Sequence, residues 1–392
     1  TPRAMAGTGI RGRRHFAGRA RKLVAAAAVV LCGLFRVLDS GRLGIPSAIF
    51  GAAGPSVAFC GSAASERRLP KVARQAATGP AISKQEMNKL ISSAETAGAV
   101  LDTVGSFIDS QLFDYIHVAT AFTKLAKVEA TIFQPERDHA SLGKLVASLR
   151  SFLQSRTLKA QAVANVCWAI ASMQHELPEL LSLMPQLLPM TEHVAKDMVP
   201  QAVSNVIWAC ATCTLDDQLL QKLLPTLAER VFELLFLRPD DFNGQDIANI
   251  IWSCAELQAR GATVSPLLDI LPVLSEVAMK RADVMNKQDV ANVMWSCAML
   301  QKGDIPVPAL LKVVPLVSAV AVKLADTMNA QNIANVLWAA SLLKDDVDVA
   351  AGLIPELARV TFKRSPTWKA KDVEMNLPMI AAALARLEDR QQ

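Results

Sequence analysis

Three side chains able to stack or to form hydrogen bonds recur at a fixed spacing in this chain. A Gln, an Asn and a Trp stand at i, i+4 and i+7 in five closely similar segments. An indole ring can stack on another flat ring, and an amide both donates and accepts hydrogen bonds. The flanking Val, Ile and small residues favour another interpretation, in which the Trp are core wedges and the Asn are buried amides bonded to backbone. The set is Gln161, Gln201, Gln245, Gln288, Gln331, Asn165, Asn205, Asn249, Asn292, Asn335, Trp168, Trp208, Trp252, Trp295 and Trp338.

Residues for covalent or metal chemistry are not arranged in known patterns. The sequence contains no Walker loop, no H-E-x-x-H, no G-x-S-x-G and no dinucleotide-binding glycine pattern. The five His are dispersed, and His117 lies on an otherwise apolar segment, which indicates a core residue. Three Cys follow a repeat Trp by two residues, where other copies have Ile170 or Ala340, and we interpret them as reduced core thiols: Cys210, Cys254 and Cys297. We therefore expect no metal site, no cofactor and no enzyme activity.

The elements that position the repeated side chains are predicted to be helices. A spacing of i, i+4 and i+7 puts the Gln, Asn and Trp on one stripe of an α-helix. An Asn suited to an N-cap precedes the last three Gln by two residues: Asn243, Asn286 and Asn329. A polar residue at the third helical position then helps to satisfy the free amide groups: Asp246, Asp289 and Asn332. The helix starts are therefore specified locally.

A second helix is predicted after each first one. Pro266 and Pro308 are expected in first turns, and Gly261 and Gly303 in loops. A further Pro, 17 or 20 residues after each repeat Trp, is expected to kink the second helix: Pro185, Pro225, Pro272, Pro315 and Pro355. The Gln recur 40 to 44 residues apart. This period predicts an all-α fold, a curved α-solenoid of helix pairs in which each unit buries its apolar face on its neighbours.

Weaker copies flank the five repeats. One begins at Phe113 and puts His117 at the Asn position and Thr120 at the Trp position; the other begins at Lys371 and puts Pro378 at the Trp position. Atypical terminal units are expected to cap a solenoid. We predict one or two further helices in residues 84–112. The helical repeat domain then covers residues 83–392, with core repeats at 160–360 and capping repeats at about 113–159 and 371–390.

Residues 1–80 have the composition of a targeting leader. They contain 13 Lys or Arg against two acids, a balance of +11, so the remainder carries −6 although the whole chain is +5. The apolar run Leu23–Phe35 has the length of a signal peptide and is short for a membrane span. It precedes an Arg-rich, acid-poor segment, and the two together resemble the leader used to enter complex plastids. We expect a plastid, with a mitochondrion second; a membrane anchor at 23–35 or a disordered tail is the alternative.

The string Q-x-[VI]-[AS]-N-[VI]-x-W-[AS], at a period near 40, resembles the octotricopeptide repeat family of organellar RNA-binding proteins. It is also similar to the helical repeats that accompany FAST-kinase-like and RAP-type proteins. The resemblance covers roughly residues 85–390. It implies an α-solenoid that binds single-stranded organellar RNA and acts in its stabilisation, processing or translation. A C-terminal RAP module is not recognisable, so the resemblance gives no support to a nuclease-like activity.

Residues that read an RNA sequence must differ between units, which excludes the constant Gln, Asn and Trp. The variable polar positions near the helix ends are the candidates for hydrogen bonds to base edges. They are Asp246, Asp289, Asn332, Lys287, Gln174, Gln258, Gln301 and Lys344. Taken singly, each could equally be a cap or part of the solvated surface. As a set they predict that one unit reads one base.

The alternative function is a HEAT- or armadillo-like scaffold for a protein partner. Electrostatics distinguishes the two, because RNA binding requires Lys or Arg near phosphates. Because the chain after the leader has a net charge of −6, these cations must gather on one face. The candidates are Lys280, Arg281, Lys287, Lys323, Lys363, Arg364, Lys369 and Lys371. An acidic concave face would instead favour the scaffold. Single-stranded RNA is the expected partner, with other proteins second and no membrane span in the mature protein.

Overall fold

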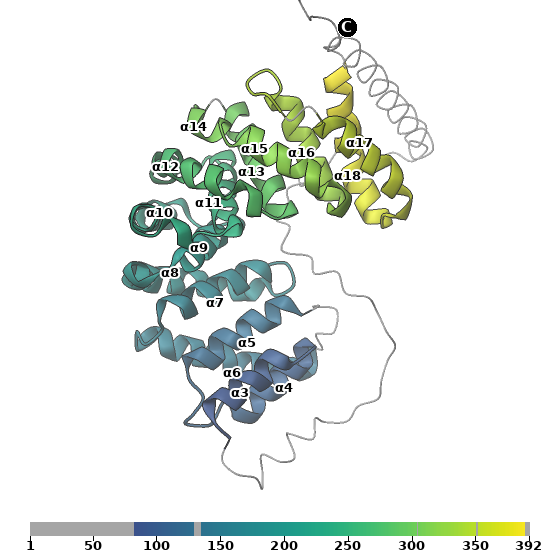
Figure 1. Ribbon diagram of the computed structural model, residues 1–392. Coiled ribbons are helices and arrows are strands. Elements are labelled where there is room, and N and C mark those ends of the chain that lie inside the picture. Colours follow the sequence, from purple (N-terminus) through teal and green to yellow (C-terminus); the bar gives the residue numbers. More distant parts are fainter. Residues whose placement is uncertain (1–81, 129–134, 304, 350–351, 389–392) are drawn as a thin grey trace, which may run out of the picture. The chain divides into compact units, whose positions relative to one another are not determined.

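The computed structural model describes residues 82–128, 135–303, 305–349 and 352–388 (Figure 1). Every regular element in these ranges is an α-helix or a 3-10 helix, which confirms the all-α class. The predicted leader, including Leu23–Phe35, lies outside the described residues.

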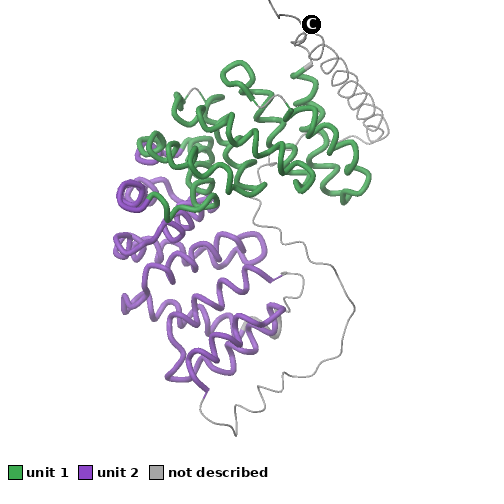
Figure 2. Tube along the Cα trace, viewed as in Figure 1, with its two compact units in different colours: residues 1–51, 239–261, 268–392 green, residues 52–238, 262–267 purple. Residues whose placement is uncertain are grey.

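The helices are grouped into two compact units (Figure 2). The described residues of unit 2 are 82–128, 135–238 and 262–267, and those of unit 1 are 239–261, 268–303, 305–349 and 352–388. The division falls between the repeat copies that begin at Pro200 and Gly244. Three of the five copies therefore belong to unit 1 and two to unit 2.

Unit 2 is built of helix pairs. Its first helices are α3 (Lys84–Ser93), α5 (Tyr115–Lys127), α7 (Ala160–Ser172) and α9 (Pro200–Thr212). Its second helices are α4 (Ala97–Phe107), α6 (Pro135–Gln154), α8 (Met184–Val194) and α10 (Asp217–Leu237), with 3-10 turns η2 (Pro178–Leu183) and η3 (Ala195–Asp197). Each first helix packs on the next first helix, and α4, α6, α8 and α10 contact one another in the same order. The pairs thus form two layers, and α3 and α4 confirm the helices predicted in residues 84–112.

Unit 1 repeats this arrangement. Its first helices are α11 (Gly244–Ala259), α13 (Lys287–Lys302), α16 (Ala330–Leu343) and α18 (Ala370–Glu388), and each packs on the next. The second helices are α12 (Ser265–Arg281, in this unit from residue 268), α14 (Pro308–Leu311) with α15 (Val314–Leu324), and α17 (Leu353–Arg364). The 3-10 turns are η4 (Pro239–Asp241), η5 (Ala282–Val284), η6 (Ala325–Thr327) and η7 (Ser365–Thr367). All five sequence copies therefore begin a helix where predicted.

Local hydrogen bonds set these helix starts, as the sequence indicated. At α13 the Asn286 side chain accepts from the amide of Asp289 at 3.1 Å, and the Asp289 carboxylate accepts from the amide of Asn286 at 3.0 Å. Asn243 and Asp246 form the same reciprocal box at α11. At α16 the Asn329 side chain accepts from the amide of Asn332 at 2.8 Å. The three predicted Asn caps are confirmed, and the third-position side chain accepts from the cap amide at Asp246 and Asp289. That second prediction is wrong at Asn332, whose buried Oδ1 has no hydrogen-bond partner among the described residues.

The same motif corrects the predicted register of α5. Its N-cap is Asp114, whose amide donates to Nδ1 of His117 at 3.0 Å, so His117 stands at the third helical position. Thr120 and Thr123, both half-buried, then occupy the positions of the Asn and the Trp. The predicted register was wrong by three residues, because this copy has no Gln or Trp to anchor it. His117 is nevertheless buried, as predicted, and its Nε2 lies 2.9 Å from the Lys84 carbonyl oxygen.

Three of the five recurrent Pro do not kink a second helix. Pro225 and Pro272 do lie inside the continuous helices α10 and α12. Pro185 and Pro315 instead stand in the first turns of α8 and α15, where a shorter helix comes before, and Pro355 is the third residue of α17. A Pro in the first turn lacks only an amide that the helix would leave unpaired anyway. The predicted kink is therefore wrong at these three positions.

The other predicted turn residues are confirmed. Pro266 and Pro308 lie in the first turns of α12 and α14. Gly261 has a φ of +77° in the loop that follows α11, a conformation that other residues rarely adopt. Gly303 ends α13.

The repeat thiols are part of the core. All five Cys within the described ranges are buried: Cys167, Cys210, Cys213, Cys254 and Cys297. Burial raises the pKa of the Cys254 thiol to about 12, so it stays protonated at neutral pH. Cys210 and Cys213 have C-x-x-C spacing, but no group of three His, Cys, Asp or Glu in the described part of the chain could hold a metal ion.

One described segment, Pro308–Thr327, is long and apolar enough to cross a membrane by length and composition alone. It is divided among α14, α15 and η6, and α15 packs on α13 and α17. Leu310, Val314 and Val317 are fully buried there. Core packing in unit 1 therefore accounts for its apolar character.

Candidate functional site

The repeated Gln, Asn and Trp lie on the stripe of each first helix that is least buried. In α7 the residues that are not buried are Gln161, Asn165, Trp168 and Ser172, spaced i, i+4, i+7 and i+11. The Gln161 amide donates to Oδ1 of Asn165 at 2.9 Å. In α16 the corresponding residues are Gln331, Asn335, Trp338 and Leu342. The stripe is thus a surface of amides and indole rings.

The exposure of these side chains confirms some predictions for the constant residues and contradicts others. Trp208 and Trp295 are buried core wedges as predicted, whereas three Trp are half-buried: Trp168, Trp252 and Trp338. The predicted buried amide is found at Asn249 alone. It is wrong at the four half-buried positions, Asn165, Asn205, Asn292 and Asn335. The reason is geometric, since a residue four positions after a solvent-facing Gln shares its face of the helix.

Three of the predicted readers are buried. Asp246, Asp289 and Asn332 have almost no exposed surface, because the third helical position turns toward the neighbouring first helix. The Asp246 and Asp289 carboxylates are bonded to their own N-cap amides. The expectation that these three side chains face a partner is therefore wrong. Burial and the nearby Asp246 raise the pKa of Asp289 to about 6, although the amide of Asn286 opposes the shift.

The remaining candidates lie near the ends of first helices, and three of them contact the next repeat. The Gln174 amide donates to the Thr212 carbonyl at 3.3 Å. Lys344 donates to the Arg386 carbonyl at 2.7 Å. Lys287 donates to the Thr327 carbonyl at 2.9 Å. Gln258 and Gln301 are half-buried at the corresponding ends of α11 and α13. The first three are therefore contacts between repeats within a unit, and none of the five is fully buried.

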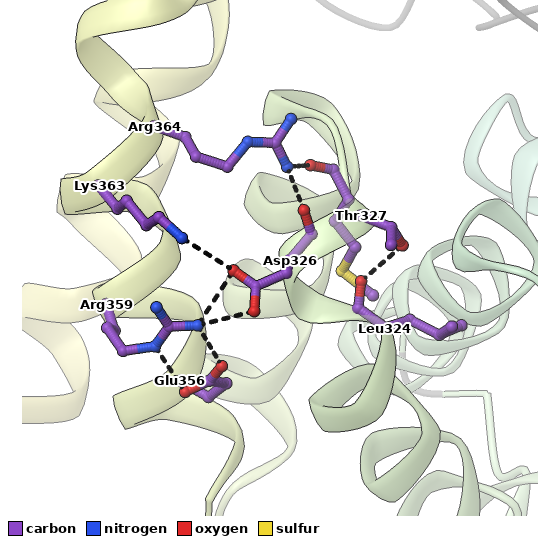
Figure 3. Close-up of polar contacts among 8 residues, drawn as sticks. Leu324, Asp326, Thr327, Glu356, Arg359, Lys363 and Arg364 are labelled. Atoms are coloured by element: carbon purple, nitrogen blue, oxygen red, sulfur yellow. Dashed lines mark hydrogen bonds and ion pairs between the residues drawn. The ribbon is translucent and has the colours of Figure 1, made fainter.

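Several of the predicted phosphate-binding cations make contacts of this kind too. In unit 1, Arg364 donates to the carbonyls of Asp326, at 2.9 Å, and of Met328 (Figure 3). Arg359 bridges Asp326 at 3.0 Å and Glu356 at 2.6 Å, and Lys363 lies 3.9 Å from Asp326. The hydrogen bond from Arg359 is the main cause that lowers the pKa of Glu356. These cations therefore join α17 to η6.

The other five members of that set either contact a carbonyl in the same way or lie apart from the stripe. Arg281, at the end of α12, donates to the Asp240 carbonyl. Lys280 and Lys323 are exposed in the last turns of α12 and α15, and Lys369 and Lys371 are exposed at the start of α18. The predicted cations thus lie at the ends of second helices and at the starts of first helices in unit 1.

Carboxylates are distributed unequally between the two layers. Between α5 and α16 the first helices carry three acids, Asp246, Glu256 and Asp289, and all three are buried. These helices also carry four cations that are exposed or half-exposed: Lys124, Lys127, Lys287 and Lys302. The second helices carry exposed acids instead: Asp217, Glu229 and Glu233 in α10, and Asp269 and Glu276 in α12. The negative balance of the body therefore resides outside the first helices from α5 to α16, whereas the outermost first helices α3 and α18 do expose Glu86 and Glu374.

One cation lies directly against the stripe. The Lys127 ammonium of α5 is 5.9 Å from the centre of the Trp168 ring of α7. This distance is within cation–π range, and the interaction contributes roughly 0.5–1 kcal/mol at an exposed site. Sequence reasoning missed Lys127 because the register assigned to α5 was shifted. The N-cap pattern at Asp114 was the signal that would have placed Lys127 four residues beyond the Trp position.

The arrangement can hold a ligand by stacking, by amide hydrogen bonds and by a few positive charges. Within the described ranges it offers no clustered nucleophile, base or metal ligand set on this face. No protein-family model matches the chain, and no curated protein was found to be similar to it.

Proposed function

We propose that this chain is a non-enzymatic RNA-binding protein, in which the helix pairs belong to an α-solenoid and the first-helix layer binds single-stranded RNA. The observation that carries the proposal is the charge distribution: every acid on the first helices from α5 to α16 is buried, while the second helices expose theirs. A polyanion is repelled by exposed carboxylates and attracted by Lys and Arg. The first-helix layer is thus the favourable surface in a body whose net charge is negative.

The side chains of the stripe suit unpaired bases. Stacking of a base on an aromatic ring contributes roughly 1–3 kcal/mol and tolerates any base. The half-buried Trp168 and Trp338 present such rings, and Asn165 and Asn335 present amides one turn away. Lys127 beside Trp168 would neutralise the phosphate of a stacked nucleotide. A duplex hides its base faces, so this surface selects single strands.

The consequence for the RNA is steric. A strand that lies along the stripe is shielded from nucleases, and its neighbouring structure is held open for processing or for a ribosome. The resemblance to octotricopeptide repeats and the leader-like residues 1–80 support an organellar RNA, with a plastid favoured over a mitochondrion. The constant amides and rings give affinity. Sequence preference is left to half-buried variable positions such as Gln258 and Gln301.

The test is fluorescence anisotropy of the purified chain with a pool of randomised single-stranded RNA across a salt series. We expect salt-dependent binding, and a Lys127→Glu variant should bind several-fold more weakly. Its salt slope should fall by about 0.7, the value for one phosphate contact on a single strand. The matched control is Lys222→Glu, an exposed Lys of α10 in the same unit that pairs with Glu192 at 3.3 Å. It should bind like the unchanged chain.

A protein scaffold is the second candidate, because part of the stripe in unit 1 is apolar. Met299 and Leu342 are half-buried at the position four residues after the Trp, where unit 2 has Ser172. Such a surface also suits an amphipathic peptide. Absence of RNA binding at low salt, or equal losses for Lys127→Glu and Lys222→Glu, would exclude the RNA proposal and leave the scaffold.

A further inference from the structure

One position of the stripe holds a different residue in every copy. It lies four residues after the repeat Trp, which is about one turn further along the same face of the first helix. The constant Gln, Asn and Trp cannot distinguish one base from another, so this position is where the copies can differ in what they bind. It is called the variable stripe position below. Its five side chains are Ser172, Thr212, Glu256, Met299 and Leu342.

Glu256 is the one charged side chain among the five, and it is paired with a cation. Nε of Arg260 donates to Oε1 of Glu256 at 2.9 Å, and Nη2 lies 2.8 Å from the same oxygen. The Glu256 side chain is 9% exposed, whereas that of Arg260 is 35% exposed. An ionised carboxylate offers about four acceptor positions, so these two contacts leave it able to accept further hydrogen bonds. Arg260 also balances its charge, which limits the repulsion of a nearby phosphate.

Packing in unit 1 does not account for this carboxylate. The variable stripe position holds Met299 in α13 and Leu342 in α16, and both are half-buried. Burial removes the hydration of an ion pair, and apolar residues of similar volume are often at least as stabilising in its place. A charged pair at a position where Met and Leu fit is therefore better explained by a ligand than by the fold.

Trp252 provides an aromatic ring beside the carboxylate. It precedes Glu256 by four residues, and residues at this spacing are neighbours on the surface of a helix. Its ring is half-buried, so the remainder of its surface is available to a base. A base that stacks on Trp252 can present its edge to Glu256. Stacking ring, acceptor and positioning cation thus lie within two turns of α11, all in unit 1.

The Watson–Crick edges of the four bases differ in what they offer a carboxylate. Guanine presents two adjacent donors, N1–H and the 2-amino group, which match the two carboxylate oxygens. Adenine and cytosine present one amino donor beside a ring nitrogen that accepts, and uracil presents one N–H between two carbonyl oxygens. Two parallel hydrogen bonds to a charged group are stronger than one bond between neutral groups. Guanine is therefore the base that a carboxylate holds best.

We propose that the repeat that begins at Gly244 selects guanine: Trp252 stacks on the base, and the Glu256 carboxylate accepts from its N1–H and 2-amino group. Arg260 is a positioning residue that fixes the carboxylate. This inference rests on the proposed RNA binding. The hydroxyls of Ser172 and Thr212 have a single oxygen, and Met299 and Leu342 lack a carboxylate. The guanine preference is thus confined to one position of the bound strand.

Fluorescence anisotropy of the full chain with three single-stranded RNA pools of equal length tests the proposal. The first pool is randomised over all four bases, the second has inosine in place of guanine, and the third contains A, C and U alone. Inosine keeps N1–H but lacks the 2-amino group. We expect the first pool to bind at least about fivefold more tightly than the third, the low end of discrimination by a bidentate contact. The inosine pool should lie between them.

Glu256→Gln should remove these differences, because the amide replaces one acceptor by a donor. Glu256→Met should do the same with a side chain that already fits the variable stripe position in α13. The matched control is Glu356→Gln in α17 of the same unit. Glu356 also pairs with an Arg one turn away, Arg359 at 2.6 Å, but it lies on a second helix. This control should keep the guanine preference, and it measures the general gain in RNA affinity when an acid is removed. Circular dichroism checks that each variant keeps its helices.

Four results would overturn the proposal. Equal binding of the three pools by the unchanged chain would show that no subsite selects guanine, while RNA binding itself would stand. A guanine preference that survives in both Glu256 variants belongs to another residue. A preference that Glu356→Gln also abolishes does not depend specifically on α11. Absence of binding to every pool would refute the proposed RNA function, and the guanine subsite with it.

Discussion

The buried Asp289 gives the sharpest prediction, which concerns stability and pH. Its carboxylate caps the start of α13, but burial and the nearby Asp246 raise its pKa from an ordinary 3.8 to about 6. The folded chain therefore holds this proton more tightly than the unfolded chain does. The protonated Asp289 therefore makes a contribution to the free energy of unfolding that is fully present below pH 4 and is lost as the pH rises through 6. The shift is about 2 pH units at about 1.4 kcal/mol each, or about 3 kcal/mol above pH 7.

Asp289→Asn should remove this loss. An Asn keeps an oxygen that can accept from the amide of Asn286 without carrying a charge. An Asn also stands at the corresponding position of α16, although the Oδ1 of this Asn332 is buried without a hydrogen-bond partner among the described residues. We expect the free energy of unfolding to rise by up to about 3 kcal/mol at pH 8, and to change little at pH 4. Urea unfolding followed by Trp fluorescence measures it, since the buried Trp295 lies in the same helix.

The control is Asp240→Asn, whose side chain is 97% exposed and should change stability by less than about 0.5 kcal/mol at either pH. If Asp289→Asn destabilises the chain at pH 8, the ionised cap contributes more than its desolvation costs, and the reasoning is wrong. Hydrogen exchange of the α13 amides gives the same comparison where unit 1 unfolds separately.

Three further predictions concern stability. Gly261→Ala should lower the free energy of unfolding by about 1 kcal/mol, because Ala is strained at a φ of +77°; an unchanged urea midpoint would contradict this. Arg364→Ala should cost roughly 1.5–3 kcal/mol, since it removes hydrogen bonds from a charged group to two carbonyls. Arg359→Ala removes surface ion pairs and should cost less than about 1 kcal/mol. Equal losses of unfolding free energy in the two Arg variants would refute this difference. Trp295→Ala should cost about 3–5 kcal/mol, and thermal unfolding would show a smaller loss for Trp168→Ala.

The candidate site was only partly predictable. The constant stripe was visible as a spacing, but the sequence favoured burial for Asn165 and Asn335, which are half-buried. It favoured exposure for Asp246 and Asp289, which are buried. A helical period shows which residues share a face, whereas the choice of the face that packs depends on the neighbouring helix. Both the helical period and the packing were needed to recognise that the first helices from α5 to α16 expose no acid.

The sequence by itself determined the first helices of the five repeats and their starts. A cap joins residues three apart, so Asn243, Asn286 and Asn329 could be recognised without knowledge of the fold. Tertiary structure decided the roles of side chains that reach the next repeat. Lys287 and Lys344 contact carbonyls 40 and 42 residues away, and the sequence period alone does not show which atoms meet there. Tertiary structure likewise decided that the first helices from α5 to α16 bury their carboxylates and that the end of α10 leaves Phe236 exposed.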